Sequence, residues 1–365
     1  MKKNIYFLNK ENEIPKERIS DVLKKLVKKE KSTDRIQYIR DILSSLNNDK
    51  LPFEWTRQEH LRFDSLNDDL AAEYLIYRYE FKVLPSKKIV RDFPLYALIE
   101  PTSVCNLRCT MCFQVDKTFT KKPFMGVMDI SLFKKLIDQL VEGGTRALTL
   151  ASRGEPLLHP KLPEMLDYCK DKFFDLKINT NGMKLTDKLI NSILENNVNE
   201  LVFSVDSFDP KEYEKIRVKG DLNKVIANIE KFNKARSSYS NSRTSTRISG
   251  VKLSDKQDMI GFKKFYSDLV DSVAYVEIEN RWDTYNNLID ISALSPCSYL
   301  WERIYVWHDG TCNPCDVDYK SQLTTGNAND LPLRNIWHSR SYENLRKDHQ
   351  SGNRSEYNPC DRCGV

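Results

Sequence analysis

Three cysteines lie close together in the stretch Glu100-Pro-Thr-Ser-Val-Cys105-Asn-Leu-Arg-Cys109-Thr-Met-Cys112-Phe113. Their C-x3-C-x2-C spacing puts three thiolates on one short loop, where each can bind one corner iron of a [4Fe–4S] cube. The fourth iron of that cube has no protein ligand nearby in the sequence, so it is open to a substrate or a cofactor. A structural zinc loop fits this triplet poorly, because zinc prefers pairs of ligands and four in total.

A second cysteine set lies in the C-terminal region, where Cys312-x2-Cys315 and Cys360-x2-Cys363 form a pair of pairs. Four thiolates in this pattern are typical of a zinc site. Zinc binding would leave Cys297 unused.

The composition excludes several classes of protein. The 365 residues suffice for one large domain or for two to three smaller ones. The net charge of +5 is too weak to indicate nucleic acid, although it would suit an anionic substrate. No apolar run has the length of a membrane span or of a signal-peptide core, so we expect a cytoplasmic protein. In that reducing compartment, nine cysteines indicate metal ligands rather than disulfides.

Strands and helices alternate from about residue 93 onward. Apolar runs predict strands over 95–99, 147–151, 176–179, 200–205, 248–253 and 273–278, and amphipathic patterns predict helices over 129–142, 160–172, 186–197 and 223–235. This alternation is typical of a parallel sheet covered by helices. Residues 1–90 instead look helical and highly charged, with a tyrosine stripe (Tyr74, Tyr77, Tyr79) whose spacing favours packing over ligand binding.

The triplet and the motifs that follow it resemble the radical S-adenosylmethionine (radical SAM) superfamily. The resemblance implies an α/β fold with a partial (β/α)6 TIM-like barrel over residues 91–285, after a helical accessory domain over residues 1–90. It implies that Cys105, Cys109 and Cys112 hold a cluster whose open iron chelates the amino and carboxylate groups of SAM. Reductive cleavage of SAM would give a 5′-deoxyadenosyl radical, which removes a hydrogen atom from an unactivated carbon.

The same resemblance implies SAM contacts at the carboxyl ends of consecutive strands, where barrel enzymes carry their chemistry. These contacts are Gly154, Glu155, Asn179, Asn181, Ser204, Asp206 and Arg217. Two positions depart from the family pattern. Arg153 replaces the first glycine of the Gly-Gly-Glu element, and would either hold SAM or a substrate or lie on the surface. Met111 stands where an aromatic residue usually contacts the adenine, and Phe113 follows the cysteine instead.

Residues 286–365 resemble the twitch subdomain, the short relative of the SPASM auxiliary-cluster domain. The shared pattern is a Cys before Leu-Trp, an Asp-Gly turn followed by Pro-Cys, then Gly-Asn, Ile-Trp and a terminal Cys-x2-Cys. It implies a second [4Fe–4S] cluster held by Cys297, Cys315, Cys360 and Cys363, with Cys312 as an extra thiol. This cluster and the zinc pair of pairs are alternative predictions for the same region.

An auxiliary cluster with four thiolate ligands has no open iron, which favours electron transfer over substrate binding. We therefore expect oxidation of an alcohol carbon of a small polyol, such as a sugar or an aminocyclitol, to a carbonyl. Flavodoxin or ferredoxin would supply electrons. Glu277 and Glu279 share a face of the sixth strand and would hold the substrate or take a proton.

Three alternatives stay open. Cys312 would donate a hydrogen atom in a redox-neutral epimerase. Residues 1–90 would recognise the partner of a peptide- or protein-modifying enzyme. In the third alternative, the chain is a non-catalytic protein that binds a metal and a partner.

Overall fold

The computed structural model describes residues 5–7, 13–239, 244–278, 283–289 and 295–363. The chain divides into two compact units, of which one is Asn9–Arg91 and the other is the rest of the chain. The central sheet belongs to the larger unit.

The smaller unit is helical. Its described residues form α1 (Lys16–Val27), α2 (Thr33–Leu46), α3 (Arg57–Asp64) and α4 (Asp68–Ser86). Leu23 of α1 and Ile42 of α2 are fully buried, as the helical spacing of their apolar residues requires. Tyr74 and Tyr79 of α4 are also buried. The tyrosine stripe therefore packs in the core of this unit.

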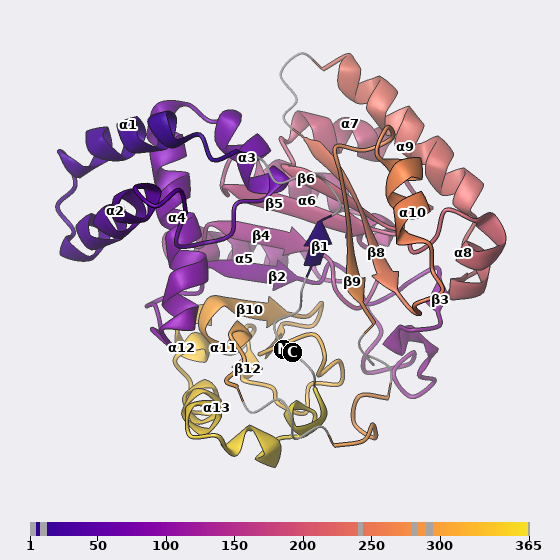
Figure 1. Ribbon diagram of the computed structural model, residues 1–365. Helices are drawn as coiled ribbons and strands as arrows, with labels where there is room; N and C mark the ends of the chain where they lie inside the picture. The colour runs from indigo at the N-terminus through magenta and orange to yellow at the C-terminus, as the bar shows by residue number, and fades with distance from the viewer. Residues whose placement is uncertain (1–4, 8–12, 240–243, 279–282, 290–294, 364–365) are drawn as a thin grey trace. The chain divides into compact units, whose positions relative to one another are not determined.

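One sheet forms the centre of the larger unit, and the described strands follow the order β1-β9-β8-β6-β5-β4-β2-β10-β11-β12 (Figure 1). Six of them are successive parallel neighbours: β2 (Tyr96–Ile99), β4 (Ala147–Leu150), β5 (Asp175–Thr180), β6 (Glu200–Ser204), β8 (Ser245–Lys252) and β9 (Ser272–Glu277). These are the six strands that the alternation predicts. The sheet stays open over the described strands, which is compatible with a partial barrel.

Helices pack on one face of this sheet. They are α5 (Ile130–Glu142), α6 (Leu162–Cys169), α7 (Asp187–Glu195), α9 (Leu222–Ser237) and α10 (Met259–Tyr266), with the short α8 (Pro210–Ile216) before α9. Alternate strand residues such as Ala97 and Leu148 share a core with Phe133 of α5. The residues between them, such as Leu98, face the opposite side, because strand side chains alternate. No described helix is both long and apolar enough to cross a membrane.

The C-terminal segment extends the sheet beyond β2. β10 (Arg303–Val306) runs parallel to β2, and β11 (Thr311–Asn313) and β12 (Gly326–Asn327) follow in antiparallel pairing. The predicted Asp309-Gly310 turn joins β10 to β11, with Gly310 at φ +84°, a conformation that suits glycine. The segment also contains α11 (Tyr299–Glu302), α12 (Leu333–Trp337) and α13 (Arg340–Gln350).

Two pairings differ from the sequence prediction. β1 (Ile5–Phe7) pairs antiparallel with β9, although it lies in a stretch predicted to be helical. β10 pairs in parallel with β2, although its sequence indicates only a hairpin. Both pairings join segments that are far apart in the chain, so no local pattern specifies them.

Leu148→Ala removes a fully buried side chain from the centre of β4. The change is expected to cost about 2–5 kcal/mol of unfolding free energy, because the lost transfer energy and the new cavity add. The control Val141→Ala, at an exposed position of α5, should stay within about 0.5 kcal/mol. Chemical denaturation of the anaerobically purified protein measures both, and equal costs would contradict the assigned core.

Candidate cofactor site

The predicted cofactor residues gather at one edge of the parallel sheet. Because β2, β4, β5 and β6 are parallel neighbours, their carboxyl ends lie at the same edge (Figure 1). The cysteine triplet follows β2, Gly154-Glu155 follows β4, Asn179 lies near the end of β5, and the half-buried Ser204 ends β6. In parallel α/β sheets, ligands bind outside these carboxyl ends.

The triplet lies on a compact loop closed by its own hydrogen bonds. Cys112 N–H donates to the Cys109 carbonyl oxygen (3.0 Å), and Leu107 N–H donates to Cys105 Sγ (3.5 Å). The two-residue strands β3 (Arg108–Cys109) and β7 (Arg217–Val218) pair and bring Arg217 to the loop. Arg217 Nη1 donates to Cys109 Sγ (3.8 Å). Burial raises the pKa of the Cys109 thiol, and the charge of Arg217 offsets only part of that rise.

The donor chemistry of the triplet fits an iron–sulfur cluster. Burial raises the pKa of Cys105 to about 12, and the charges of Glu155, Cys112 and Cys109 add to this effect. Three thiolates held this close repel one another, and binding to a metal offsets that repulsion. Among the described residues, no three side chains are already arranged as ligands around one metal ion. The residues that would hold the cluster are nevertheless on one loop with sulfur donors only.

Gly154 and Glu155 pack the end of β4 against its neighbours. A Cβ at position 154 would lie 2.2 Å from the Thr102 carbonyl oxygen, so the backbones approach too closely for any residue but glycine. The buried carboxylate of Glu155 accepts hydrogen bonds from Thr180 Oγ1 (2.6 Å) and Asn181 N–H (2.7 Å). Burial raises the pKa of Glu155 despite these bonds. Glu155 therefore shapes the turn after β5.

Two buried polar atoms at neighbouring strand ends have no hydrogen-bond partner among the described residues. Asn179 Oδ1 is one of them, and Ser152 Oγ at the end of β4 is the other. Buried polar atoms are normally hydrogen bonded, so two of them on neighbouring strand ends are consistent with a ligand site. Asn181 differs, because its side-chain amide bonds to Asn106 (3.0 Å) and to Met183 N–H (3.0 Å).

Asp206 and Arg217 form a buried ion pair beside Cys109. Arg217 Nε lies 2.7 Å from Asp206 Oδ2, and its Nη2 donates to Oδ1 (3.0 Å). Val251 N–H on β8 donates to the same carboxylate (2.8 Å), which fixes it from a second side. Burial lowers the pKa of Arg217, but the charges of Asp206 and Cys109 raise it more, so the guanidinium stays charged.

Phe113 and Met111 differ in what they can offer to SAM. The buried Phe113 ring stacks on Tyr319 of the C-terminal segment (ring centroids 4.9 Å apart, planes at 16°) and meets Phe119 edge-on (5.4 Å). Protein contacts occupy the ring, so its position gives no support to an adenine contact. Met111 is half-buried and keeps that role as a prediction.

Arg153 is not a surface residue, so that sequence alternative is wrong. It is 3% exposed, and its Nε and Nη2 donate to the two oxygens of Glu100 (2.7 and 2.6 Å). His308, just after β10, places Nδ1 3.1 Å from the same carboxylate. The pattern in the sequence singles out neither Glu100 nor His308. The one local signal is an acidic residue directly after the apolar run 95–99.

Four C-terminal cysteines influence one another electrostatically. Burial raises the pKa of Cys315, and the charges of Cys360 and Cys363 raise it further. Burial also raises the pKa of Cys360, with added effects of Cys297 and Cys363. These are the four thiols that the twitch resemblance implies. Arg354 donates to the carbonyl oxygens of Cys360 (3.2 Å) and Cys363 (2.7 Å), and so holds the terminal turn.

Cys312 lies apart from that set. It is fully buried, opposite Val306 in the β10–β11 pair, and both side chains belong to the helix-covered core with Trp337. Trp307, one residue beyond Val306, belongs to a separate cluster that also contacts Cys315. The position of Cys312 therefore supports neither a zinc pair with Cys315 nor a hydrogen donor in the barrel.

Glu277 ends β9 with a side chain that is 49% exposed, 3.3 Å from Lys252 Nζ. This exposed salt bridge gives no support to a catalytic role. Glu279 lies outside the described residues, so its role stays a prediction.

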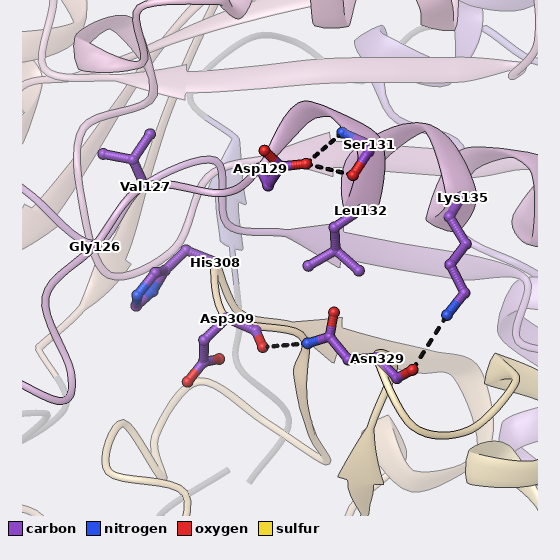
Figure 2. Close-up of a pocket in the computed structure, with 9 residues that line it drawn as sticks. All are labelled: Gly126, Val127, Asp129, Ser131, Leu132, Lys135, His308, Asp309 and Asn329. Atoms are coloured by element: carbon purple, nitrogen blue, oxygen red, sulfur yellow. Dashed lines mark hydrogen bonds between the residues drawn. The ribbon is translucent and has the colours of Figure 1, made fainter.

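Two cavities open beside the β10–β11 turn. The larger, of about 610 Å³, lies between the start of α5 and that turn (Figure 2). Its polar groups largely bind neighbours: Asp129 accepts from Ser131, and Lys135 donates to the Asn329 carbonyl oxygen (3.4 Å). The second, of about 430 Å³, adjoins the strand ends through Arg153. Its lining also includes Trp307, Asp309, Thr311, Lys320, Ser321, Thr324 and Asn327.

Two protein-family models match the chain. The model for the radical SAM superfamily matches residues 99–265, and the model for an iron–sulfur cluster-binding domain, SPASM, matches residues 297–364. The first range contains the cysteine triplet, and the second contains the C-terminal cysteines. Together the two matches imply [4Fe–4S] clusters and SAM as cofactors.

Similar proteins support the fold. A tungsten-containing aldehyde ferredoxin oxidoreductase cofactor-modifying protein of Pyrococcus furiosus is 36% identical over 112 residues, which is 30% of this chain and 30% of that protein. This chain thus spans under a third of that relative's length. The crystal structure of BtrN in complex with AdoMet and 2-DOIA is similar with a TM-score of 0.53 and 19% identity, covering 76% of this chain and 95% of BtrN. Streptococcus suis SuiB bound to S-adenosylmethionine has a TM-score of 0.57 and 16% identity, covering 82% and 77%. At these identities, the two solved structures show the fold alone.

Cys297→Ala is expected to remove one cluster, about four irons per chain, because it deletes a member of the mutually coupled quartet. Cys312→Ala deletes a thiol of the same segment without touching the quartet, and should keep its iron. Iron, sulfide and zinc analysis after anaerobic reconstitution measures both. Loss of bound zinc in Cys312→Ala, with metal kept in Cys297→Ala, would support the zinc pair of pairs instead.

Proposed function

We propose that this chain, which belongs to the radical SAM superfamily, oxidises an alcohol carbon of a hydroxylated small molecule to a carbonyl. When bound, SAM and the two clusters supply the radical that removes the C–H hydrogen and the acceptor for the remaining electron. The protein then has to bind the substrate, exclude water and take the O–H proton. Loss of one C–H hydrogen, one proton and one electron balances the conversion of an alcohol to a carbonyl.

The separation of Cys312 from the other C-terminal cysteines carries this proposal. Besides burial, the charges of Cys360 and Cys363 raise the pKa of Cys315, and those of Cys297 and Cys363 raise the pKa of Cys360. Cys312 instead lies in the helix-covered core. Four thiolates saturate a cluster and leave no iron for a substrate, which suits the site to electron transfer. An enzyme with such an electron acceptor is equipped for net oxidation rather than for epimerisation.

The smaller cavity supports a small polar substrate. Its volume of about 430 Å³ falls within the usual range for small-molecule sites, about 300–1,000 Å³. The Thr311 hydroxyl would hydrogen bond to a polyol there. Thr324 and Asn327 also line the cavity, but their side chains already donate to the carbonyl oxygens of Cys312 (3.1 Å) and Asp309 (3.3 Å). Asp309 is the carboxylate of the cavity wall and joins Glu277 and Glu279 as a candidate acceptor for the O–H proton. Flavodoxin or ferredoxin would restore the electrons.

We assign the SAM contacts to the strand ends. Arg217 would meet the SAM carboxylate with the two N–H groups that its bonds to Asp206 and Cys109 leave over. Asn179 Oδ1 would accept a hydrogen bond from a ribose hydroxyl, which would satisfy that buried atom. Met111 would lie against the adenine. Glu155 and Asn181 would act by fixing the turn after β5, since their polar atoms already bond within it.

Modification of a peptide is the second candidate. SuiB has also been solved bound to precursor peptide SuiA, and that structure is similar to this chain with a TM-score of 0.54. The helical unit Asn9–Arg91 would then recognise the peptide. Product mass separates the candidates, because oxidation removes two hydrogens from a small molecule, epimerisation leaves the mass unchanged, and peptide modification alters a peptide.

Reconstituted protein reduced with dithionite is expected to form 5′-deoxyadenosine from SAM. Cys109→Ala should abolish this activity, because it removes one of three ligands of the first cluster. Cys169→Ala is the matched control, since Cys169 is also buried but lies in α6, in the helix-covered core. Chromatography measures 5′-deoxyadenosine, and a panel of polyols is then screened for a product that is lighter by two hydrogens. A fully iron-loaded protein that forms no 5′-deoxyadenosine would favour a non-catalytic metal protein.

A further inference from the structure

The guanidinium of Arg153 lies at a buried junction between segments that are far apart in the chain. Its Nε and Nη2 bind Glu100, five residues before Cys105, and its Nη1 donates to the Tyr319 carbonyl oxygen (2.9 Å), four residues after Cys315. All three of its nitrogens are thus engaged by protein. These bonds use three of the five N–H donors of the guanidinium and fix the orientation of its plane. Its Cζ atom lies over the Trp307 ring, 4.3 Å from the ring centroid.

Glu100 extends the junction to the end of β10. Its Oε1 accepts from His308 N–H (3.2 Å) and lies 3.1 Å from His308 Nδ1. Burial alone would raise the pKa of Glu100, but the charge of Arg153 and the hydrogen bond with His308 bring it down to about 2. One ionised carboxylate therefore ties together the ends of β2, β4 and β10.

Tyr319 connects the buried junction of Arg153 and Glu100 to the loop with the cysteine triplet. Its ring stacks on Phe113, next to Cys112, and its hydroxyl donates to Asp116 (2.9 Å). Lys320 Nζ lies 2.7 Å from the same carboxylate. Residues 319–320 are thus attached to the triplet loop by stacking, hydrogen bonding and an ion pair. The Arg153 guanidinium also binds the backbone of this segment, at the Tyr319 carbonyl oxygen.

We propose that Arg153 is a positioning residue that fixes the C-terminal cysteine set relative to the triplet, and that it is not a SAM ligand. A fork of donors is required, because one side chain must reach both Glu100 and the Tyr319 carbonyl oxygen. Lysine keeps the charge but has no such fork. The inference rests on the proposed two-cluster function and deepens it, since electron transfer depends on the separation of the two sites.

The test is electron paramagnetic resonance of the reduced holoprotein, which reports two separate quantities. The magnetic interaction between the clusters depends on their separation, and the change of the first signal on adding SAM reports SAM binding. In Arg153→Lys and Arg153→Gln, the cluster–cluster interaction is expected to shift, while the SAM-induced change is retained. Arg153→Lys guards against a folding failure, because its ammonium can still pair with Glu100.

Arg247→Lys is the matched control. Arg247 is also buried and ion-paired, with Glu200 (3.3 Å), within the parallel strands. It should lose comparable thermal stability but keep the cluster–cluster interaction. A merely structural role for Arg153 would make the two lysine variants behave alike and would overturn the proposal.

Two further results would also overturn it. One is an unchanged cluster–cluster interaction in both Arg153 variants. The other is loss of the SAM-induced change with the interaction retained, which would make Arg153 a SAM ligand. Failure of the proposed function is detected separately, on the wild-type protein alone. Metal analysis would then find one cluster plus zinc, or the SAM-cleavage assay would give no 5′-deoxyadenosine.

Discussion

The shared direction of the strands is the constraint on which the candidate site depends. Parallel pairing sends the carboxyl ends of β2, β4, β5 and β6 to one edge, so motifs spread from Cys105 to Arg217 meet there. β10 joins the same edge by pairing in parallel with β2. The turn after β10, which carries His308, therefore lies at this edge next to Glu100.

Buried ion pairs hold the edge together. Glu100 with Arg153 and Asp206 with Arg217 are almost fully removed from water, and each carboxylate also accepts a backbone hydrogen bond. A buried charge without such partners is costly, so the members of each pair depend on each other. This explains how an arginine can stand where the family pattern has a glycine. The chain supplies Glu100 as its counter-charge and Trp307 as an aromatic surface.

Strand alternation places Cys312 and Cys315 in different surroundings. Val306 and Cys312 face the helix-covered core, while Tyr305 and Trp307 cluster on the other side with Cys315 close by. Cys312 and Cys315 are three residues apart in the sequence but belong to different surroundings. A Cys-x2-Cys spacing therefore does not by itself make a ligand pair, because the local backbone decides where each sulfur lies.

The sequence by itself determined the six alternating parallel strands, the tyrosine core of α4, the Asp309-Gly310 turn and the grouping of Cys105, Cys109 and Cys112 on one loop. Each of these depends on a local property, such as apolar periodicity, turn chemistry or ligand spacing, which is visible in a short stretch of the sequence. The tertiary structure alone decided that β10 pairs with β2, that β1 pairs with β9, that Arg153 is buried against Glu100, and that Phe113 stacks on Tyr319. These are contacts between segments that lie tens to hundreds of residues apart, and their partners are specified by the global packing of the chain rather than by any window of its sequence.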